Sequence, residues 1–307
     1  MFRILSIDGG GIKGVFPASF LAALQADLPH PIADYFDRIA GTSTGGIIAI
    51  GLGLGLSAQE LLEFYKSEGP AIFPPSAAAG WIRHWFVSKY QPEPLRDALN
   101  KAIGAKSLGD SKHRLIIPTL NAATGEIYIY KTRHHTKLET DWRVPAVEVA
   151  LATSAAPTYF PIHRSTINVP FIDGGIWANN PTGLAVVEAV TLLEQAPSDI
   201  RVLSLGCTYS PVDFRPKLGG KLGWARKAIE AAMSGQSGGS MGTAYMIAGH
   251  PSVMRVDPAV EKGFAELDKA RAIPDLEGLG YSEARQWRPA LKPVFFVEPA
   301  PPFEPVP

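Results

Sequence analysis

The stretch Gly41-Thr42-Ser43-Thr44-Gly45 decides the expected fold. Ile39 and Ala40 before it end a short apolar run typical of a buried strand, and the apolar run at residues 47–56 is typical of a buried helix. A G-x-S-x-G sequence between a strand and a helix is the pattern of a nucleophile elbow, in which two glycines let the backbone turn sharply and expose the serine hydroxyl. Because so short a pattern also arises by chance, a glycine-rich turn that caps a core helix is the alternative.

Length and composition fit one large α/β domain or two smaller ones, since the chain has 307 residues, of which 46% are hydrophobic and 19% charged. The formal net charge of 0 argues against a nucleic acid polymer as a partner. Cys207 is the single cysteine, and we expect a buried thiol in a reducing compartment. Residues 1–7 are too short for a signal peptide, and no apolar stretch reaches about 20 residues. We therefore expect a cytoplasmic protein whose membrane contact is peripheral.

A second glycine-rich stretch, Asp8-Gly9-Gly10-Gly11-Ile12-Lys13-Gly14, follows an apolar run at residues 2–7 that is typical of a buried strand. It has three interpretations. A dinucleotide-binding fingerprint needs a second strand that ends in an acidic residue about 20 positions on, and the elbow leaves no room for that strand. A structural turn is the second interpretation. The third is an oxyanion hole, whose free backbone amides stabilise negative charge beside Ser43, and it is favoured because both loops follow short strands expected in one sheet.

The rest of the chain alternates strands with helices. Besides residues 47–56, we expect helices at residues 15–28, 57–66, 94–103, 144–156, 181–193, 224–233, 260–270 and 282–290. Further strands are expected at residues 115–120, 126–131, 171–172, 201–205 and 253–256. This order predicts an α/β fold with a mainly parallel central sheet and helices on both faces, a three-layer α/β/α arrangement.

Ser43 needs a base, because a serine hydroxyl is a poor nucleophile on its own. A Ser-Asp-His order would use His250, the one histidine that follows Asp173 in the sequence. The rival is a dyad in which Asp173, at the end of a short apolar strand, takes the serine proton directly. We expect that strand to place Asp173 at the carboxyl edge of the sheet, where partial burial would raise its low intrinsic pKa. A plain Asp-Gly-Gly turn is the alternative.

Two other segments suggest functions without deciding them. Residues 69–94 are rich in Pro, Gly, Ala and aromatic side chains, which fits either an insertion packed on the core or a lid that faces lipid. Lys217, Lys221, Arg226 and Lys227 form the strongest basic cluster. That cluster is either a solvated face or a contact for an anionic membrane surface or a phosphate-bearing regulator. No metal is expected, because no dense Asp/Asn loop of the kind that binds calcium is visible.

The glycine loop, the elbow and Asp173-Gly174-Gly175 occur in the order found in the patatin-like phospholipase family, which residues 1–206 resemble. The stretches at residues 152–160 and 179–181 are similar to that family as well. The resemblance implies a patatin-like fold and lipid acyl hydrolysis without a cofactor. It also implies the site residues: Ser43 as nucleophile, Asp173 as base, and Gly9, Gly10 and Gly11 as oxyanion donors. It favours the dyad over the triad.

Residues 207–307 are expected to be a C-terminal portion of helices and a strand that packs on the same domain. This portion, including Leu267-Asp268-Lys269-Ala270, is similar to bacterial patatin-like effectors of CBASS antiphage systems. That narrower resemblance implies activation by a cyclic dinucleotide, a regulatory role for residues 207–307, homo-oligomers on activation and attack on membrane phospholipid at the inner face of the cell membrane. The alternatives are an unregulated lipid acyl hydrolase, a Ser-His-Asp esterase and a binding module without catalysis.

Overall fold

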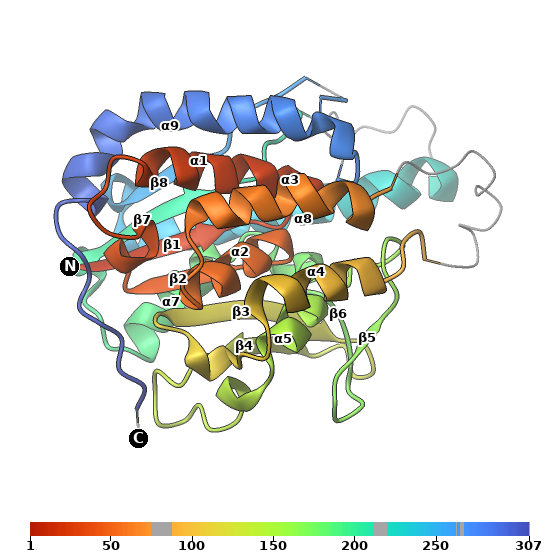
Figure 1. Cartoon of the computed structure of the whole chain (residues 1–307), viewed down its shortest axis with the longest axis horizontal. Helices are drawn as coiled ribbons and strands as arrows, with labels where there is room; N and C mark the ends of the chain where they lie inside the picture. The colour runs from red at the N-terminus through yellow and green to blue at the C-terminus, as the bar shows by residue number, and fades with distance from the viewer. Residues whose placement is uncertain (75–87, 212–219, 262, 265–266, 307) are drawn as a thin grey trace.

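The computed structural model describes residues 1–74, 88–211, 220–261, 263–264 and 267–306, and for residues 220–230 it describes the backbone alone. Within these ranges an eight-stranded sheet lies between two layers of helices (Figure 1). The strands are β1 Phe2–Ile7, β2 Arg38–Gly41, β3 Arg114–Asn121, β4 Ile127–Lys131, β5 His163–Arg164, β6 Pro170–Asp173, β7 Ile200–Leu205 and β8 Val253–Val256. The helices are α1 Val15–Gln25, α2 Thr44–Gly53, α3 Ala58–Ile72, α4 Glu93–Ile103, α5 Ala146–Thr153, α6 Gly175–Ala178, α7 Thr182–Thr191, α8 Gly220–Ala248 and α9 Ile273–Phe295.

The sheet has the order β5-β6-β3-β2-β1-β7-β8, and β4 pairs with β3. The pairs of β1 with β2, β1 with β7, β2 with β3 and β7 with β8 are all parallel. β4 and β6 run antiparallel to β3. The predicted three-layer α/β/α fold with a mainly parallel sheet is therefore confirmed.

The central strand β1 is buried on both faces, which is why it reads as a continuous apolar run. Leu5 and Ile7 point into the larger core, which is built with α1, α2, α3 and α9. Phe2 and Ile4 point into a second core with α7 and α8. The alternation of side chains along the strand thus feeds both helical layers.

Strand β3 carries different partners along one of its edges. β2 pairs with residues 114–116 of β3, β4 with residues 116–120, and β6 with residues 119–121. Because β4 occupies one edge at residues 116–120, where β2 and β6 also pair, β2 and β6 must share the other edge. The chain of β2 leaves this edge at Gly41, and β6 arrives from the opposite direction and stops at Asp173. Pro118, which has no N–H to donate to a sheet partner, lies between the two.

The C-terminal part of the chain departs from the expected helices. The helix expected at residues 260–270 is wrong: Ala259 bridges Tyr209, and Val260 N donates to Tyr209 O at 2.8 Å. These tertiary contacts hold the backbone extended where local propensity would allow a helix. The last helix, α9, begins at Ile273 and is much longer than the expected segment at residues 282–290.

Helix α8 is also longer than the expected segment at residues 224–233, although its second half is rich in glycine. Packing against the start of α7 compensates for the weak helix propensity of glycine. Ser240 Oγ donates to Asn180 O at 2.7 Å and accepts from Gly183 N at 2.8 Å. Among the helices of the described residues, none combines the length and the apolar composition that crossing a bilayer requires.

Residues after 206 add to the same layers as the rest of the chain. β8 extends the sheet by pairing with β7, and α9 lies along α1 on the outer surface (Figure 1). The helix contact is close, because Ser19 Oγ of α1 donates to Glu277 O of α9 at 2.7 Å. A Cβ at Gly280 would lie 2.7 Å from Ser19 Cβ, so glycine is needed for this approach.

Candidate active site

Ser43 occupies the turn between β2, which ends at Gly41, and α2, which begins at Thr44. Its φ of 55° and ψ of −123° are rare for a residue with a side chain and indicate local strain. A Cβ at Gly41 would lie 2.1 Å from Gly45 O, and a Cβ at Gly45 would lie 2.3 Å from Ile7 O. Both glycines of the G-x-S-x-G stretch are therefore needed for the turn to pack against itself and against β1.

Asp173 is the direct partner of Ser43. Ser43 Oγ donates a hydrogen bond of 2.6 Å to Asp173 Oδ2, and Asp173 Oδ1 accepts one of 2.6 Å from Gly175 N. Burial raises the pKa of Asp173 to about 6, although both hydrogen bonds act to lower it. A carboxylate with this pKa, bonded directly to a hydroxyl, can accept the hydroxyl proton near neutral pH.

The two side chains meet because their strands end head to head on one edge of β3. The strand that ends at Asp173, β6, is antiparallel to β3, although most of the sheet is parallel. β6 starts beyond the carboxyl end of β3 and runs back until Asp173 pairs with Thr119. At that level β2 has already turned away into the elbow. Asp173 thus lies at the predicted carboxyl edge of the sheet, on a strand that runs toward the sheet from beyond that edge.

The glycine loop lies beside Ser43, because a Cβ at Gly9 would be 3.1 Å from Ser43 Cβ. Gly9 itself cannot be a free oxyanion donor, since its amide donates to Asn179 O at 3.0 Å. This corrects one of the three predicted donors. In the described part of the chain, the amides of Gly10 and Gly11 have no hydrogen-bond acceptor. Gly10 and Gly11 therefore remain the predicted oxyanion donors.

A family model described as patatin-like phospholipase matches residues 5–186. The match covers more than half of the chain and includes the glycine loop, the elbow and Asp173. The chain belongs to the patatin-like phospholipase family.

Curated relatives in this family include two proteins named cGAMP-activated phospholipase. One, from Pseudomonas aeruginosa, is 38% identical over 209 residues, which cover 67% of this chain and 62% of that protein. The other, from Vibrio cholerae, is 36% identical over 244 residues, which cover 72% of this chain and 69% of that protein. Patatin-like protein 2 of Oryza sativa is 32% identical over 247 residues, which cover 67% of this chain and 61% of that protein. The matched region is thus between 61% and 69% of the length of these relatives.

The family-like stretch at residues 152–160 holds the backbones of both site residues. Thr153 Oγ1 accepts a hydrogen bond of 3.1 Å from Ser43 N and donates one of 2.6 Å to Pro118 O. Ala155 O accepts a hydrogen bond of 3.0 Å from Asp173 N. The end of α5 therefore fixes Ser43 and Asp173 relative to each other.

An ion pair that sequence reasoning missed anchors the start of the glycine loop. Arg255 of β8 donates to both carboxylate oxygens of Asp8 at 3.0 and 2.6 Å, and also to Asp257 at 2.8 Å. Asp8 is buried and directly precedes Gly9. No local pattern marks Arg255, because its partner is 247 positions away along the chain.

A second support comes from Leu267 and Asp268, which we call the 267–268 clamp. Leu267 O accepts from Ile12 N at 2.8 Å, so it holds the far end of the glycine loop. Asp268 Oδ2 accepts from Tyr90 Oη at 2.8 Å and forms an ion pair with Lys89. The clamp therefore joins the glycine loop to the segment that precedes α4.

His250 lies far from this patatin-like site. It begins a short 3₁₀ helix directly before β8, and the paired residues of β8, β7, β1 and β2 place Val253 at the level of Arg38. Ser43 lies beyond the opposite, carboxyl end of β2. At about 3.3 Å per residue, the separation is at least about 15 Å. The alternative with His250 as base is therefore wrong, and the ring of His250 stacks on Tyr245 with centroids 4.1 Å apart.

Residues 69–94 and the basic cluster are only partly within the residues that the structure describes. Residues 75–87 of the expected lid or insertion lie outside the described residues, as does Lys217 of the basic cluster. Lys221, Arg226 and Lys227 lie on α8, where the backbone alone is described. Cys207 is buried, as expected, and burial raises the pKa of its thiol. Within the described ranges, no group of three or more His, Cys, Asp or Glu side chains could hold a metal ion.

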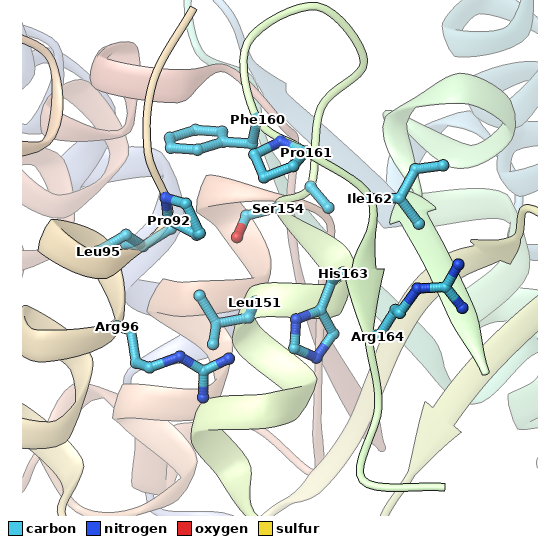
Figure 2. A pocket seen from close by; sticks show the side chains of 11 residues that line it. Pro92, Leu95, Arg96, Leu151, Ser154, Phe160, Pro161, Ile162, His163 and Arg164 are labelled. Carbon is cyan, nitrogen blue, oxygen red and sulfur yellow. The ribbon is translucent and has the colours of Figure 1, made fainter. Parts of the chain in front are cut away.

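A cavity of about 150 Å³ opens between α4, the end of α5 and β5 (Figure 2). Its wall is largely apolar and includes Leu151 and Phe160, with Arg96 and His163 at one side. Both of these basic side chains contact Glu148, His163 Nε2 at 3.0 Å and Arg96 at 2.6 Å. The neighbouring His163 and Arg96 side chains hold the pKa of Glu148 at about 2. Arg164 also lines the cavity, and it donates to Asn168 Oδ1 rather than to a carboxylate. Most of the remaining lining is apolar.

Proposed function

We propose that this protein is a serine acyl hydrolase that cleaves acyl esters of glycerophospholipids through a Ser43–Asp173 dyad. The observation that carries the proposal is the 2.6 Å hydrogen bond between Ser43 Oγ and Asp173 Oδ2 at a strained elbow. Membership of the patatin-like phospholipase family supports it, as do the names of the relatives. The apolar cavity, which adjoins the site through Ala155, suits part of an acyl chain.

In the proposed reaction, Asp173 takes the hydroxyl proton while Ser43 Oγ attacks the ester carbonyl carbon. The negative charge on the carbonyl oxygen is stabilised by the amides of Gly10 and Gly11, together with the Thr44 amide at the start of α2. Asp173 then returns the proton to the departing alcohol oxygen. A water molecule next attacks the acyl carbon and gives a proton to Asp173, which passes it to Ser43 Oγ as the fatty acid leaves.

We further propose that a cyclic dinucleotide such as cGAMP switches this activity on. The support is the printed name of the relatives from Pseudomonas aeruginosa and Vibrio cholerae, which call them cGAMP-activated. Residues 207–307 are the proposed regulatory region. Lys217, Lys221, Arg226 and Lys227 are the proposed phosphate contacts. The protein would then act in the cytoplasm, at the inner face of the cell membrane, and assemble into homo-oligomers on activation.

The test is labelling of the protein by a fluorophosphonate, with and without cGAMP, alongside release of fatty acid from phospholipid vesicles. Ser43→Ala should abolish both signals, and Asp173→Asn should lower both by about a hundred- to ten-thousandfold, the usual contribution of a general base. His250→Gln is the matched control and should leave both unchanged. Labelling of Ser43→Ala at the native rate would remove Ser43 as the nucleophile. Equal activity with and without cGAMP would remove the regulation while keeping the hydrolase.

A further inference from the structure

The β5–β6 hairpin projects past the edge of the sheet that carries Ser43. Phe171 pairs with Asn121, the last residue of β3, and Ala122 N donates to Pro170 O at 2.9 Å. Residues 165–169 therefore lie beyond the carboxyl end of β3. Figure 1 shows this hairpin on the same side of the molecule as the carboxyl ends of the parallel strands. The strand that leads back from the hairpin ends at Asp173.

Large apolar side chains are exposed on and near this hairpin. Ile167 at its tip is 81% exposed, Ile162 before β5 is 53% exposed, and Ile176 in α6 is 45% exposed. Single exposed aliphatic residues are ordinary on a protein surface. Here three exposed isoleucines fall within residues 162–176, the stretch that also carries Asp173, and we call this stretch the rim. Ile162 also lines the cavity shown in Figure 2, so this rim is continuous with the cavity.

The hairpin tip does not need an isoleucine for its own structure. Asn168, with a φ of 62°, and Ser165 form the turn: Asn168 N donates to Ser165 O at 2.8 Å and Val169 N donates to Ser165 Oγ at 3.1 Å. Polar residues with such backbone hydrogen bonds are those that turns favour. Ile167 contributes exposed apolar surface on this hydrogen-bonded support.

The hairpin itself carries one positive charge and no acidic residue before Asp173. Between Glu148 and Glu188 the sequence has one acidic residue, Asp173, and it is buried. Arg164 on the hairpin is exposed and donates to Asn168 Oδ1 at 3.2 Å. A bilayer with anionic headgroups would meet apolar side chains and one positive charge on the hairpin. The exposed Glu126 lies on the neighbouring β3–β4 turn and not on the hairpin itself.

We propose that the β5–β6 hairpin and Ile176 dock this protein on a phospholipid bilayer, with Ile167 and Ile162 inserted among the lipids and Arg164 at the headgroups. This orientation would place the mouth of the Ser43 site and the cavity against the membrane surface. The inference rests on the proposed function in that the bilayer is the source of substrate, but docking itself requires no turnover.

The experiment measures docking without catalysis. Protein carrying Ser43→Ala is sedimented with vesicles of phosphatidylglycerol and phosphatidylethanolamine, with and without cGAMP. Adding Ile167→Asp should weaken vesicle binding about tenfold, which is at the lower end of what burial of one aliphatic side chain contributes. The matched control is Val297→Asp, since Val297 is 74% exposed at the opposite edge, next to Phe296, which packs on Tyr35 before β2. Ile167→Trp should bind more tightly than the parent.

A second measurement separates docking from the chemistry. In the protein with Ser43 intact, Ile167→Asp should reduce hydrolysis of vesicle phospholipid about tenfold. It should leave hydrolysis of the water-soluble ester p-nitrophenyl butyrate unchanged. Three results would each overturn the docking surface. The first is vesicle binding by Ile167→Asp at the native level, and the second is an equal loss of binding in Ile167→Asp and Val297→Asp. The third is no vesicle binding by the Ser43→Ala protein either with or without cGAMP. If the protein with native Ser43 hydrolyses neither the vesicle phospholipid nor the soluble ester, the proposed hydrolase is overturned instead.

Discussion

Lowering the pH should switch off the reactivity of Ser43 in a range set by the burial of Asp173. Burial raises the pKa of this carboxyl from 3.8 to about 6. At about pH 5 only roughly one Asp173 in eleven would then be ionised and able to accept the Ser43 proton. An ordinary aspartate would still be more than about nine-tenths ionised there. We therefore expect an approximately tenfold loss of rate between about pH 8 and pH 5.

The assay is the rate of fluorophosphonate labelling across this pH range, in the presence of cGAMP where the activity requires it. Labelling isolates the attack by Ser43, because the fluoride leaving group needs no proton from the enzyme. His250→Gln should show the same acid limb, which excludes titration of that histidine. A labelling rate that stays constant down to about pH 5 would refute Asp173 as the base. So would a residual labelling rate of Asp173→Asn that falls with the same pH midpoint as that of the native protein.

The raised pKa of Asp173 also affects the stability of the fold. Because the folded pKa lies above the unfolded value of 3.8, the folded state binds the Asp173 proton more tightly than the unfolded chain does. The stabilisation of the fold by this proton is fully present below about pH 4 and is lost as the pH rises through about 6. Asp173→Asn should therefore be more stable than the native chain at about pH 7, by at most about 3 kcal/mol, and the difference should vanish below about pH 4. Urea unfolding at the two pH values measures it, and an equal difference at both would contradict the linkage.

Three further substitutions test the supports of the site. Ser43→Gly should be about 1 kcal/mol more stable than Ser43→Ala, because glycine relieves the strained φ at the elbow. Urea unfolding of the two variants measures this difference, and equal stabilities would show that the strain is absent. Gly10→Ala should reduce labelling about a hundred- to a thousandfold, since its Cβ would lie 2.4 Å from Cys207 Cβ, and adding Cys207→Gly should recover part of the rate unless the loss has another cause. Asp268→Asn should lower the free energy of unfolding by about 1–3 kcal/mol because it breaks the ion pair with Lys89, and an unchanged urea midpoint would count against the clamp.

The sequence predicted well those features that depend on neighbouring residues. The elbow around Ser43 is a local device: its two glycines avoid clashes with atoms no more than a few residues away or in the adjacent strand, and so the pattern is visible in five letters. The strand at residues 2–7 was predicted with its observed limits, because burial on both faces makes it apolar throughout. The start of the helix expected at residues 57–66 was likewise predictable, because the capping box of Ser57 and Glu60 joins residues only three positions apart.

Features that depend on distant pairing could not be predicted in the same way. Glycine at position 9 looked like an oxyanion donor, but its amide is taken by Asn179, 170 positions away. The extended backbone at Val260 replaces an expected helix because it pairs with Tyr209. Arg255 carries no local signal at all, yet it holds the carboxylate that precedes the glycine loop.

Sequence alone therefore determined which residues could do the chemistry: a serine on a sharp turn, an aspartate after a short strand, and a loop of glycines. Only the tertiary structure decided how they act together. β2 and β6 share one edge of β3 and end against each other, so Ser43 and Asp173 meet although 130 positions separate them. The same packing removes Asp173 from water and raises its pKa, and it leaves His250 at the far edge of the sheet. Burial and strand direction are properties of the assembled sheet, and no single segment of the chain contains them.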